Sequence, residues 1–260
     1  MLIDVNAYLG HFAFRQLRYA TAAALLRLMD RKGIDKAVVS SASAIVYRNP
    51  QAGNEELAAD IRRHRDRLIP FAVINPSYAG WQDDLKISHE EFGAKGLRLY
   101  PKWHNFALAD TCCIELVNAA TERGLIVSIP IRAEDHRQHH WLCDVPDLQL
   151  AEIVPLLNAC PSAQFILLNG LGYAKSPLGQ KSDGLLPNYT IEISRLSALL
   201  GNELGQLLAN LGAHRLVFGT GMPFTYPDPA LLKLEVLGAT DGDKEMIRWQ
   251  NAARLLGEVT

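Results

Sequence analysis

The stretch from Leu25 to Ser41, LLRLMDRKGIDKAVVSS, contains one helix-to-strand unit of the chain. Leu25, Leu28 and Met29 are spaced at i, i+3 and i+4, and this spacing places them on one face of a helix. Gly33 follows these apolar positions and is typical of a helix C-cap, because a positive φ costs glycine little. The β-branched run that comes next predicts a buried strand.

The same alternation recurs along the chain, and further apolar helical patterns end at Gly124 and Gly212. We expect strands near residues 2–8, 36–41, 69–75, 94–100, 125–132, 164–169, 189–194 and 215–220. Eight strand–helix units favour an α/β fold of the closed (β/α)8 TIM-barrel type over an open doubly wound sheet. No helix opens with the G-x-G-x-x-G pattern of dinucleotide-binding folds. Since such a barrel needs roughly 250 residues, one domain is expected to fill residues 1–260.

Composition excludes several classes of partner. The chain is 48% hydrophobic and 21% charged, with a formal net charge of −2 and no basic stripe, so neither nucleic acid nor an anionic membrane surface is an expected partner. No apolar run is long enough to span a bilayer, and the N-terminus does not resemble a signal peptide. The four cysteines show no disulfide framework, which favours reduced thiols and a cytoplasmic location. Self-association into a homo-oligomer is left open.

Several stretches, in order and spacing, resemble the amidohydrolase-related (amidohydrolase 2 type) family of metal-dependent hydrolases and decarboxylases. Residues 3–10, IDVNAYLG, lie where that family has I-D-x-H-x-H-x-G, and residues 218–224, FGTGMPF, resemble its F-G-S-D-x-P-F. Further similar stretches are residues 33–40, 53–55, 66–71, 93–101 and 251–257. The resemblance covers nearly the whole chain and implies a barrel whose site lies at the C-terminal ends of the strands.

The departures from the family pattern concern its metal ligands. The five ligand positions of the family fall on Asn6, Tyr8, Pro130, Asn169 and Gly221. Proline and glycine side chains supply no ligand, and amides and phenols are poor zinc ligands. The resemblance implies a metal that polarises the substrate and makes hydroxide near neutral pH. This chain is therefore not expected to run that mechanism there, and no cofactor is expected, with zinc or another divalent metal conceivable only at a relocated site.

Alternation along the strands predicts which side chains point into the barrel mouth. The expected inward set is Asp4, Asn6 and Tyr8; Arg98 and Tyr100; Ser128, Pro130 and Arg132; and Thr190, Glu192 and Ser194, with Asn169 ending the sixth strand. We expect Arg98 and Arg132 to share one cavity. Because a buried arginine is costly unless paired, they either form a closed ion-pair lattice with Glu192 or bind a carboxylate or phosphate. Both alternatives stay open.

The segment from Arg132 to Asp144 concentrates histidines and charges. If it is helical, His136 and His140, or His139 and Cys143, are spaced to share a metal. Alternatively, it is a charged loop that folds over the barrel mouth and pairs within itself. A third interpretation has this loop lining the pocket, with His136 or Glu134 transferring protons.

Three functional hypotheses follow. The first is a hydrolase, or a decarboxylase-type lyase, that acts on a small carboxylate-bearing compound without the family metal. In it Arg98 and Arg132 bind the anion and Glu192, His136 or Tyr8 move protons. Asn6, Tyr100 and Asn169 complete its substrate-binding set. The second is a catalytically inactive relative that binds a small molecule or serves as a scaffold, which the replacement of all five ligand positions favours. Tyr8 and Tyr100 are more often core aromatics than catalytic acids. The third is a metal hydrolase with ligands recruited from residues 134–144.

Overall fold

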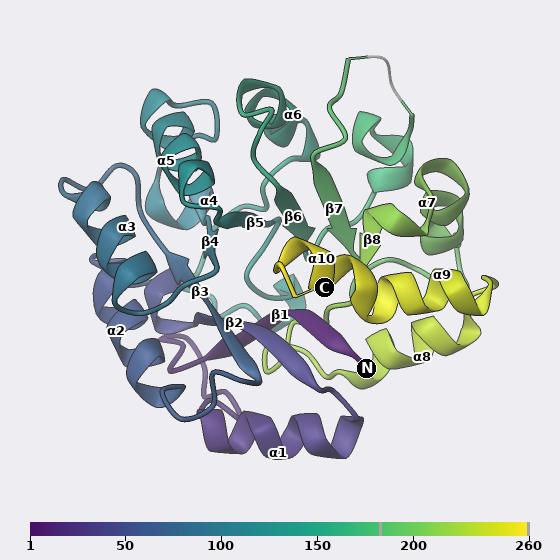
Figure 1. The fold of residues 1–260 in the computed structure, drawn as a ribbon, viewed down its shortest axis with the longest axis horizontal. Coiled ribbons are helices and arrows are strands. Elements are labelled where there is room, and N and C mark those ends of the chain that lie inside the picture. The colour runs from purple at the N-terminus through teal and green to yellow at the C-terminus, as the bar shows by residue number, and fades with distance from the viewer. Residues whose placement is uncertain (182–183, 259–260) are drawn as a thin grey trace.

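The computed structural model describes residues 1–181 and 184–258. Its eight parallel strands form one sheet in the order β1 to β8, ringed by helices (Figure 1). The strands are β1 (Ile3–Leu9), β2 (Lys36–Ser41), β3 (Leu68–Val73), β4 (Gly96–Arg98), β5 (Ile126–Pro130), β6 (Phe165–Leu168), β7 (Tyr189–Glu192) and β8 (Leu216–Val217). The segment after β8 returns beside β1, where the amide of Tyr8 donates to Met222 O at 2.9 Å. The expected TIM barrel is therefore confirmed.

Most helices surround the barrel, whereas α10 lies across one end of it and packs against the inner layer (Figure 1). They are α1 (Ala22–Lys32), α2 (Pro50–Asp60), α3 (Trp81–Glu90), α4 (Pro101–His104), α5 (Thr111–Glu122), α6 (Leu150–Ala159), α7 (Glu203–Leu211), α8 (Asp228–Val236), α9 (Asp241–Glu245) and α10 (Asn251–Leu255). Gly33 caps α1 with a left-handed φ of 66°, and its amide donates to the last turn of the helix, as the sequence predicts. Within the described ranges, no helix has the length and apolar character to cross a membrane.

Two apolar layers hold the barrel together. The outer layer packs strand residues such as Leu97 and Ile191 against the helices, whereas the inner layer contains Val38, Phe71 and Val217. The outward side chains of β4 and β7 are those that alternation predicts, so Arg98 and Glu192 point inward as expected.

Strand β1 departs from simple alternation. Its register with β2 runs from Asp4 opposite Ala37 to Ala7 opposite Val39, so β1 carries one extra residue, a β-bulge. Ile3 and Val5 therefore belong to the inner layer before the bulge. The expectation that Asp4 shares the inward face with Asn6 and Tyr8 is wrong, because the extra residue reverses the alternation between them.

Candidate functional site

Three of the five positions that hold the metal in the similar family lie together, namely Asn6, Asn169 and Gly221. Asn6 at β1 donates through Nδ2 to Asn169 Oδ1 after β6 at 2.8 Å, and Gly221 N donates to Asn6 O at 2.7 Å. A β-carbon on Gly221 would lie 3.4 Å from Asn169 Oδ1 and 2.9 Å from Thr225 Oγ1. Together with its φ of +75°, this crowding favours glycine there over a side chain that carries a ligand.

The residues at this centre do not fit a metal. The amide nitrogen of Asn6 is directed at Asn169 and, at 3.4 Å, at Glu192. The side chains of Pro130 and Gly221 supply no ligand atom. The centre thus offers amides and one carboxylate, where a transition metal prefers imidazole, thiolate or several carboxylates. Over residues 1–181 and 184–258, no three or more His, Cys, Asp or Glu side chains are grouped to hold a metal ion. No chemical step is therefore assigned to a metal at this place, and the expectation of a metal-free protein stays a prediction.

Glu192 is the carboxyl group at the centre of this cluster. It is fully buried and accepts hydrogen bonds from Asn169 N at 3.1 Å, from Ser194 Oγ at 2.9 Å and from the Ser194 amide. Burial raises its pKa, and the hydrogen bonds from Asn169 and Ser194 oppose that rise. Among the described residues, Glu192 forms no ion pair with Arg98 or Arg132, so the closed lattice of these three groups is wrong.

Asp4 is a second buried carboxyl group beside this cluster, and sequence reasoning assigned it no role. It accepts hydrogen bonds from Thr220 Oγ1 at 2.6 Å, Thr220 N at 3.0 Å and Asn6 N at 2.8 Å. Burial raises its pKa to about 7, with the charge of Glu192 acting in the same direction and the Thr220 hydroxyl against it. An acid inside a predicted strand was the only signal in the sequence.

Arg98 lies inside the barrel, as predicted, but its side chain does not line the cavity beside Arg132. It is completely buried and donates to Ala7 O, Val5 O and Ser128 Oγ, each at 3.2 Å. Its guanidinium also lies 4.7 Å from the centroid of the Tyr8 ring. The expectation that Arg98 and Arg132 share one cavity is therefore wrong. Three of the five N–H groups of Arg98 are held by two β1 carbonyls and a serine hydroxyl, and substrate binding by Arg98 stays a prediction.

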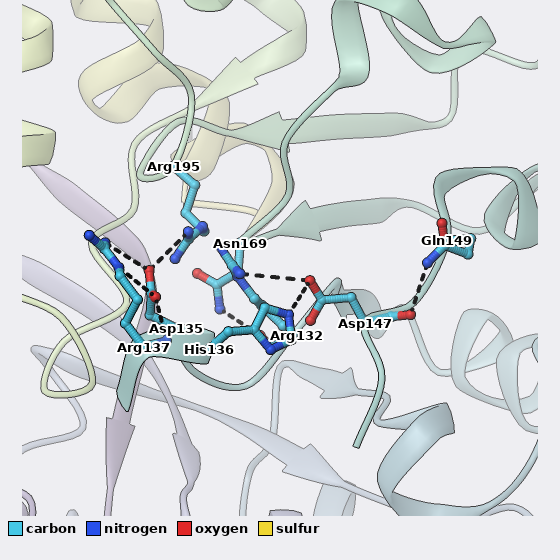
Figure 2. A network of polar contacts seen from close by, with 8 residues as sticks. All are labelled: Arg132, Asp135, His136, Arg137, Asp147, Gln149, Asn169 and Arg195. Carbon is cyan, nitrogen blue, oxygen red and sulfur yellow. Dashed lines mark hydrogen bonds and ion pairs between the residues drawn. The ribbon is translucent and has the colours of Figure 1, made fainter. Parts of the chain in front are cut away.

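Arg132 follows β5 and takes part in a network of polar contacts on the loop (Figure 2). Its Nη1 lies 3.7 Å from Asp147 Oδ2, and its carbonyl accepts a hydrogen bond from Asn169 Nδ2 at 3.1 Å. It lines a cavity of about 10 Å³ together with Tyr100 and Lys102. That volume admits about one water molecule, so no substrate fits beside Arg132 in this conformation.

The loop between Arg132 and Asp147 pairs largely within itself. His136 is 53% exposed and lies 3.0 Å from Asp147 Oδ2, so it faces this carboxylate in the structure, and its role in proton transfer stays a prediction (Figure 2). Asp135 accepts from Arg137 and Arg195, and the hydrogen bond from Arg137 is the main cause that lowers its pKa to about 2.

The metal-binding alternative for this loop required a helix. The only helical turn there spans His136–Gln138, so the i, i+4 pairs of histidine and cysteine do not form. Instead, the His136 ring packs edge-on against His139 at 4.7 Å and His140 stacks on Trp141 at 5.7 Å. The interpretation as a charged loop that pairs within itself is confirmed in part, because Glu134 pairs with Arg15 and Asp135 also pairs with Arg195, both outside the loop.

An aromatic plug closes the mouth of the barrel. We use this name for Tyr8, Phe12, Tyr100, Trp103 and Phe224, which pack in one apolar cluster. Phe224 makes edge-to-face contacts with Tyr8 at 4.9 Å and with Phe12 at 5.0 Å. The hydroxyls of Tyr8 and Tyr100 are buried without a hydrogen-bond partner in the described part of the chain. Burial, and then the nearby Tyr8, raise the pKa of Tyr100 well above its ordinary value.

Comparisons with known proteins agree with this architecture. A profile of the family described as amidohydrolase matches residues 13–257, and the chain belongs to this family. A search of curated proteins finds no match. Among solved structures, a putative amidohydrolase from Staphylococcus aureus has a TM-score of 0.73 at 15% identity, covering 98% of this chain and 99% of the other.

Two further similar structures are decarboxylases. The 5-carboxyvanillate decarboxylase of Sphingomonas paucimobilis has a TM-score of 0.72 at 16% identity and covers 98% of both chains. A dihydroxybenzoic acid decarboxylase from Polaromonas sp. JS666, solved with bound manganese and an inhibitor, has a TM-score of 0.71 at 17% identity, covering 98% of this chain and 96% of that one. Family and neighbours therefore include enzymes, while identities this low show a shared fold and no more.

Proposed function

We propose that the protein is an enzyme of the amidohydrolase family that acts on a small carboxylate-bearing compound without a metal at the family centre. Glu192 would be its proton donor and acceptor. The observation that carries this proposal is a buried carboxyl group with a raised pKa, placed where the family positions Asn6 and Asn169 converge. Groups perturbed in this way are characteristic of catalytic sites.

Three unsatisfied polar atoms support a ligand in the barrel mouth. They are Asn6 Oδ1 and the hydroxyls of Tyr8 and Tyr100, all buried without a partner among the described residues. A buried polar group left unpaired costs roughly 1–3 kcal/mol, and native cores contain few of them. Phenol hydroxyls donate well to a carboxylate, so a bound substrate would satisfy the two tyrosines that the protein leaves unpaired.

Decarboxylation is the reaction that these residues favour. In that reaction the bond from the carboxylate carbon to its neighbour breaks and the electron pair stays on the neighbour. That atom takes the proton of Glu192, carbon dioxide leaves, and water reprotonates the carboxyl group. Hydrolysis instead needs an activated water, which a metal usually provides near neutral pH, and the residues at this centre do not fit one. A hydrolase is therefore the weaker form of this proposal.

The test is turnover of a panel of hydroxybenzoates and small dicarboxylates, followed by release of carbon dioxide from protein treated with a chelator. We expect Glu192→Gln to lower turnover by about 10²–10⁴-fold, the usual contribution of a general acid. Tyr8→Phe tests the unpaired hydroxyl, with Tyr47→Phe as its control because the Tyr47 hydroxyl already donates to Glu56 and Tyr47 is not a plug residue. Undiminished turnover in Glu192→Gln, or turnover restored only by added manganese, would refute the proposal.

A non-catalytic role is the second candidate, and the aromatic plug favours it. Tyr8 and Tyr100 are at most 2% exposed, so a substrate reaches them only if Phe12 and Phe224 move aside. A protein that never opens would show no turnover and no slowing of hydrogen exchange at β1 on addition of any carboxylate. An enzyme would show turnover and a slowing of hydrogen exchange at β1 when its substrate is added.

A further inference from the structure

A cavity of about 460 Å³ lies beside α1, away from Glu192 and its partners. Its walls come mainly from the loop before α1, the second half of α1 and the segment that joins β8 to α8, with Gln138 added from the loop after β5. Its size falls within the range of small-molecule sites. The cationic side chains that line it are Arg15, Arg18, Arg31 and Lys32. The cavity is thus far larger than the space beside Arg132, where the sequence led us to expect an anion.

The charges around this cavity do not balance. Arg15 pairs with Glu134 at 3.0 Å, and Lys32 pairs with Asp228. Arg31 donates to the Tyr19 hydroxyl at 3.1 Å and has no carboxylate partner among the described residues. Arg18 is exposed and forms no hydrogen bond or ion pair within residues 1–181 and 184–258. Two guanidinium groups therefore carry positive charge that the described chain does not neutralise.

Tyr19 holds one of these guanidinium groups in place. Its φ is +60°, which is a strained backbone conformation for a bulky residue, and strain of this kind concentrates at functional sites. The guanidinium of Arg31 lies 5.4 Å from the centroid of the Tyr19 ring as well as bonding its hydroxyl. This fixes the position of Arg31 before any ligand arrives, which lowers the entropic cost of binding.

The cavity also has apolar walls. Phe224 and Tyr226 line it, and Tyr226 leaves 73% of its surface exposed. An aromatic side chain that exposed can stack on a flat group of a ligand, while guanidinium groups bind carboxylate or phosphate oxygens two at a time.

We propose that this cavity binds a small dianion that carries a flat apolar group, with Arg18 and Arg31 as its anion-binding residues. Phosphate monoesters and aromatic dicarboxylates share this chemistry. The proposal does not depend on the function proposed for the barrel mouth, because Glu192, Asn6 and Asn169 do not line this cavity.

The test measures binding by calorimetry with phenyl phosphate, phthalate, inorganic phosphate, benzoate and benzyl alcohol. We expect the two aromatic dianions to bind best and benzyl alcohol not to bind. Arg18→Ala and Arg31→Ala should each weaken binding by roughly 10–100-fold, the effect of losing a charged hydrogen bond. Arg27→Ala is the matched control, because Arg27 is also exposed on α1 but does not line the cavity.

The order of affinities distinguishes the two ligand classes, and the variants test where the ligand binds. Tighter binding of phenyl phosphate than of phthalate would assign the site to phosphate monoesters, and the reverse order would assign it to dicarboxylates. Unchanged binding in Glu192→Gln would place the ligand outside the barrel mouth. The proposal fails if benzoate binds as tightly as the dianions, or if Arg27→Ala weakens binding as much as Arg31→Ala. It also fails if no dianion binds with a Kd below about 10 mM.

Discussion

Arg98 in the barrel interior and Arg31 beside α1 carry the same guanidinium group in opposite surroundings. Arg98 is fully buried, and backbone carbonyls of β1 and a serine hydroxyl accept its hydrogen bonds. Arg31 is exposed, and a tyrosine hydroxyl is its only described partner. The N–H groups of Arg98 that form these bonds stabilise the fold, whereas most N–H groups of Arg31 are available to a ligand. An arginine is therefore evidence for an anion site only once its acceptors are known.

The largest change in the free energy of unfolding is expected for Arg98, the arginine inside the barrel. Arg98→Met should lower the free energy of unfolding by roughly 5 kcal/mol, because three buried acceptors lose their donors at about 1–3 kcal/mol each. Urea unfolding measures this loss. A loss below about 1 kcal/mol would mean that water or neighbouring donors replace the guanidinium, and the contrast with Arg31 would disappear.

The second effect concerns the pH dependence that the buried carboxyl groups impose. The pKa of Asp4 is about 7 in the folded protein, compared with its ordinary value of 3.8. The contribution of protonated Asp4 to the free energy of unfolding is therefore complete below pH 4 and is lost as the pH rises through 7. At about 1.4 kcal/mol per pH unit, this amounts to roughly 4 kcal/mol.

Asp4→Asn should remove that part of the pH dependence. The free energy of unfolding of the variant, relative to the unaltered protein, should therefore rise between pH 4 and pH 7. Chemical unfolding at several pH values measures the difference between the two proteins, in which contributions from Glu192 and Glu134 largely cancel. Parallel pH profiles would show that Asp4 is ionised at its ordinary pKa.

A smaller effect is expected at the border between the two regions, since Phe224 belongs to the plug and also lines the open cavity. Phe224→Leu should cost roughly 1–3 kcal/mol, because it removes two edge-to-face contacts worth about 0.5–1.5 kcal/mol each. Tyr226→Leu is the control in the same segment and should change stability by less than about 0.5 kcal/mol, because Tyr226 is exposed. Equal effects would mean that the plug does not contribute to stability.

The smallest effect on stability is expected where the effect on binding is largest. Arg18→Ala and Arg31→Ala should each change the free energy of unfolding by no more than about 0.5 kcal/mol, as exposed substitutions usually do. Thermal melts without ligand measure this. A loss above about 1 kcal/mol in Arg31→Ala would identify its contact with Tyr19 as structural and would remove the distinction from Arg98.

Much of the fold was accessible from local patterns. Apolar spacing and the glycine after Met29 locate α1 and its end, and the alternation in β4 and β7 correctly turns Arg98 and Glu192 inward. Strand ends were less accurate, since β4 spans Gly96–Arg98 where residues 94–100 were expected. The bulge in β1 had no signal in the sequence, and it is the reason why the orientation of Asp4 was predicted wrongly.

The candidate site was predictable only in part. The resemblance placed Asn6, Asn169 and Gly221 together, and they do meet. The partners of the charged groups were not predictable, because they depend on loops that fold back over the barrel. Arg15 reaches Glu134 and His136 reaches Asp147 in this way. The cavity beside α1 was missed because its walls come from segments far apart in the chain, around α1 and after β8, that only the folded protein brings together.

The sequence by itself determined the eight strand–helix units and the family, and it predicted that the metal chemistry of the family does not occur at this centre. These follow from residue identity and local spacing, because proline and glycine side chains supply no ligand in any fold and amides and phenols are poor zinc ligands. Tertiary structure alone decided which charged groups are satisfied and which are free. That depends on contacts between residues far apart in the chain and on one extra residue in β1, and it is these contacts that bury Arg98 and leave Arg18 and Arg31 exposed.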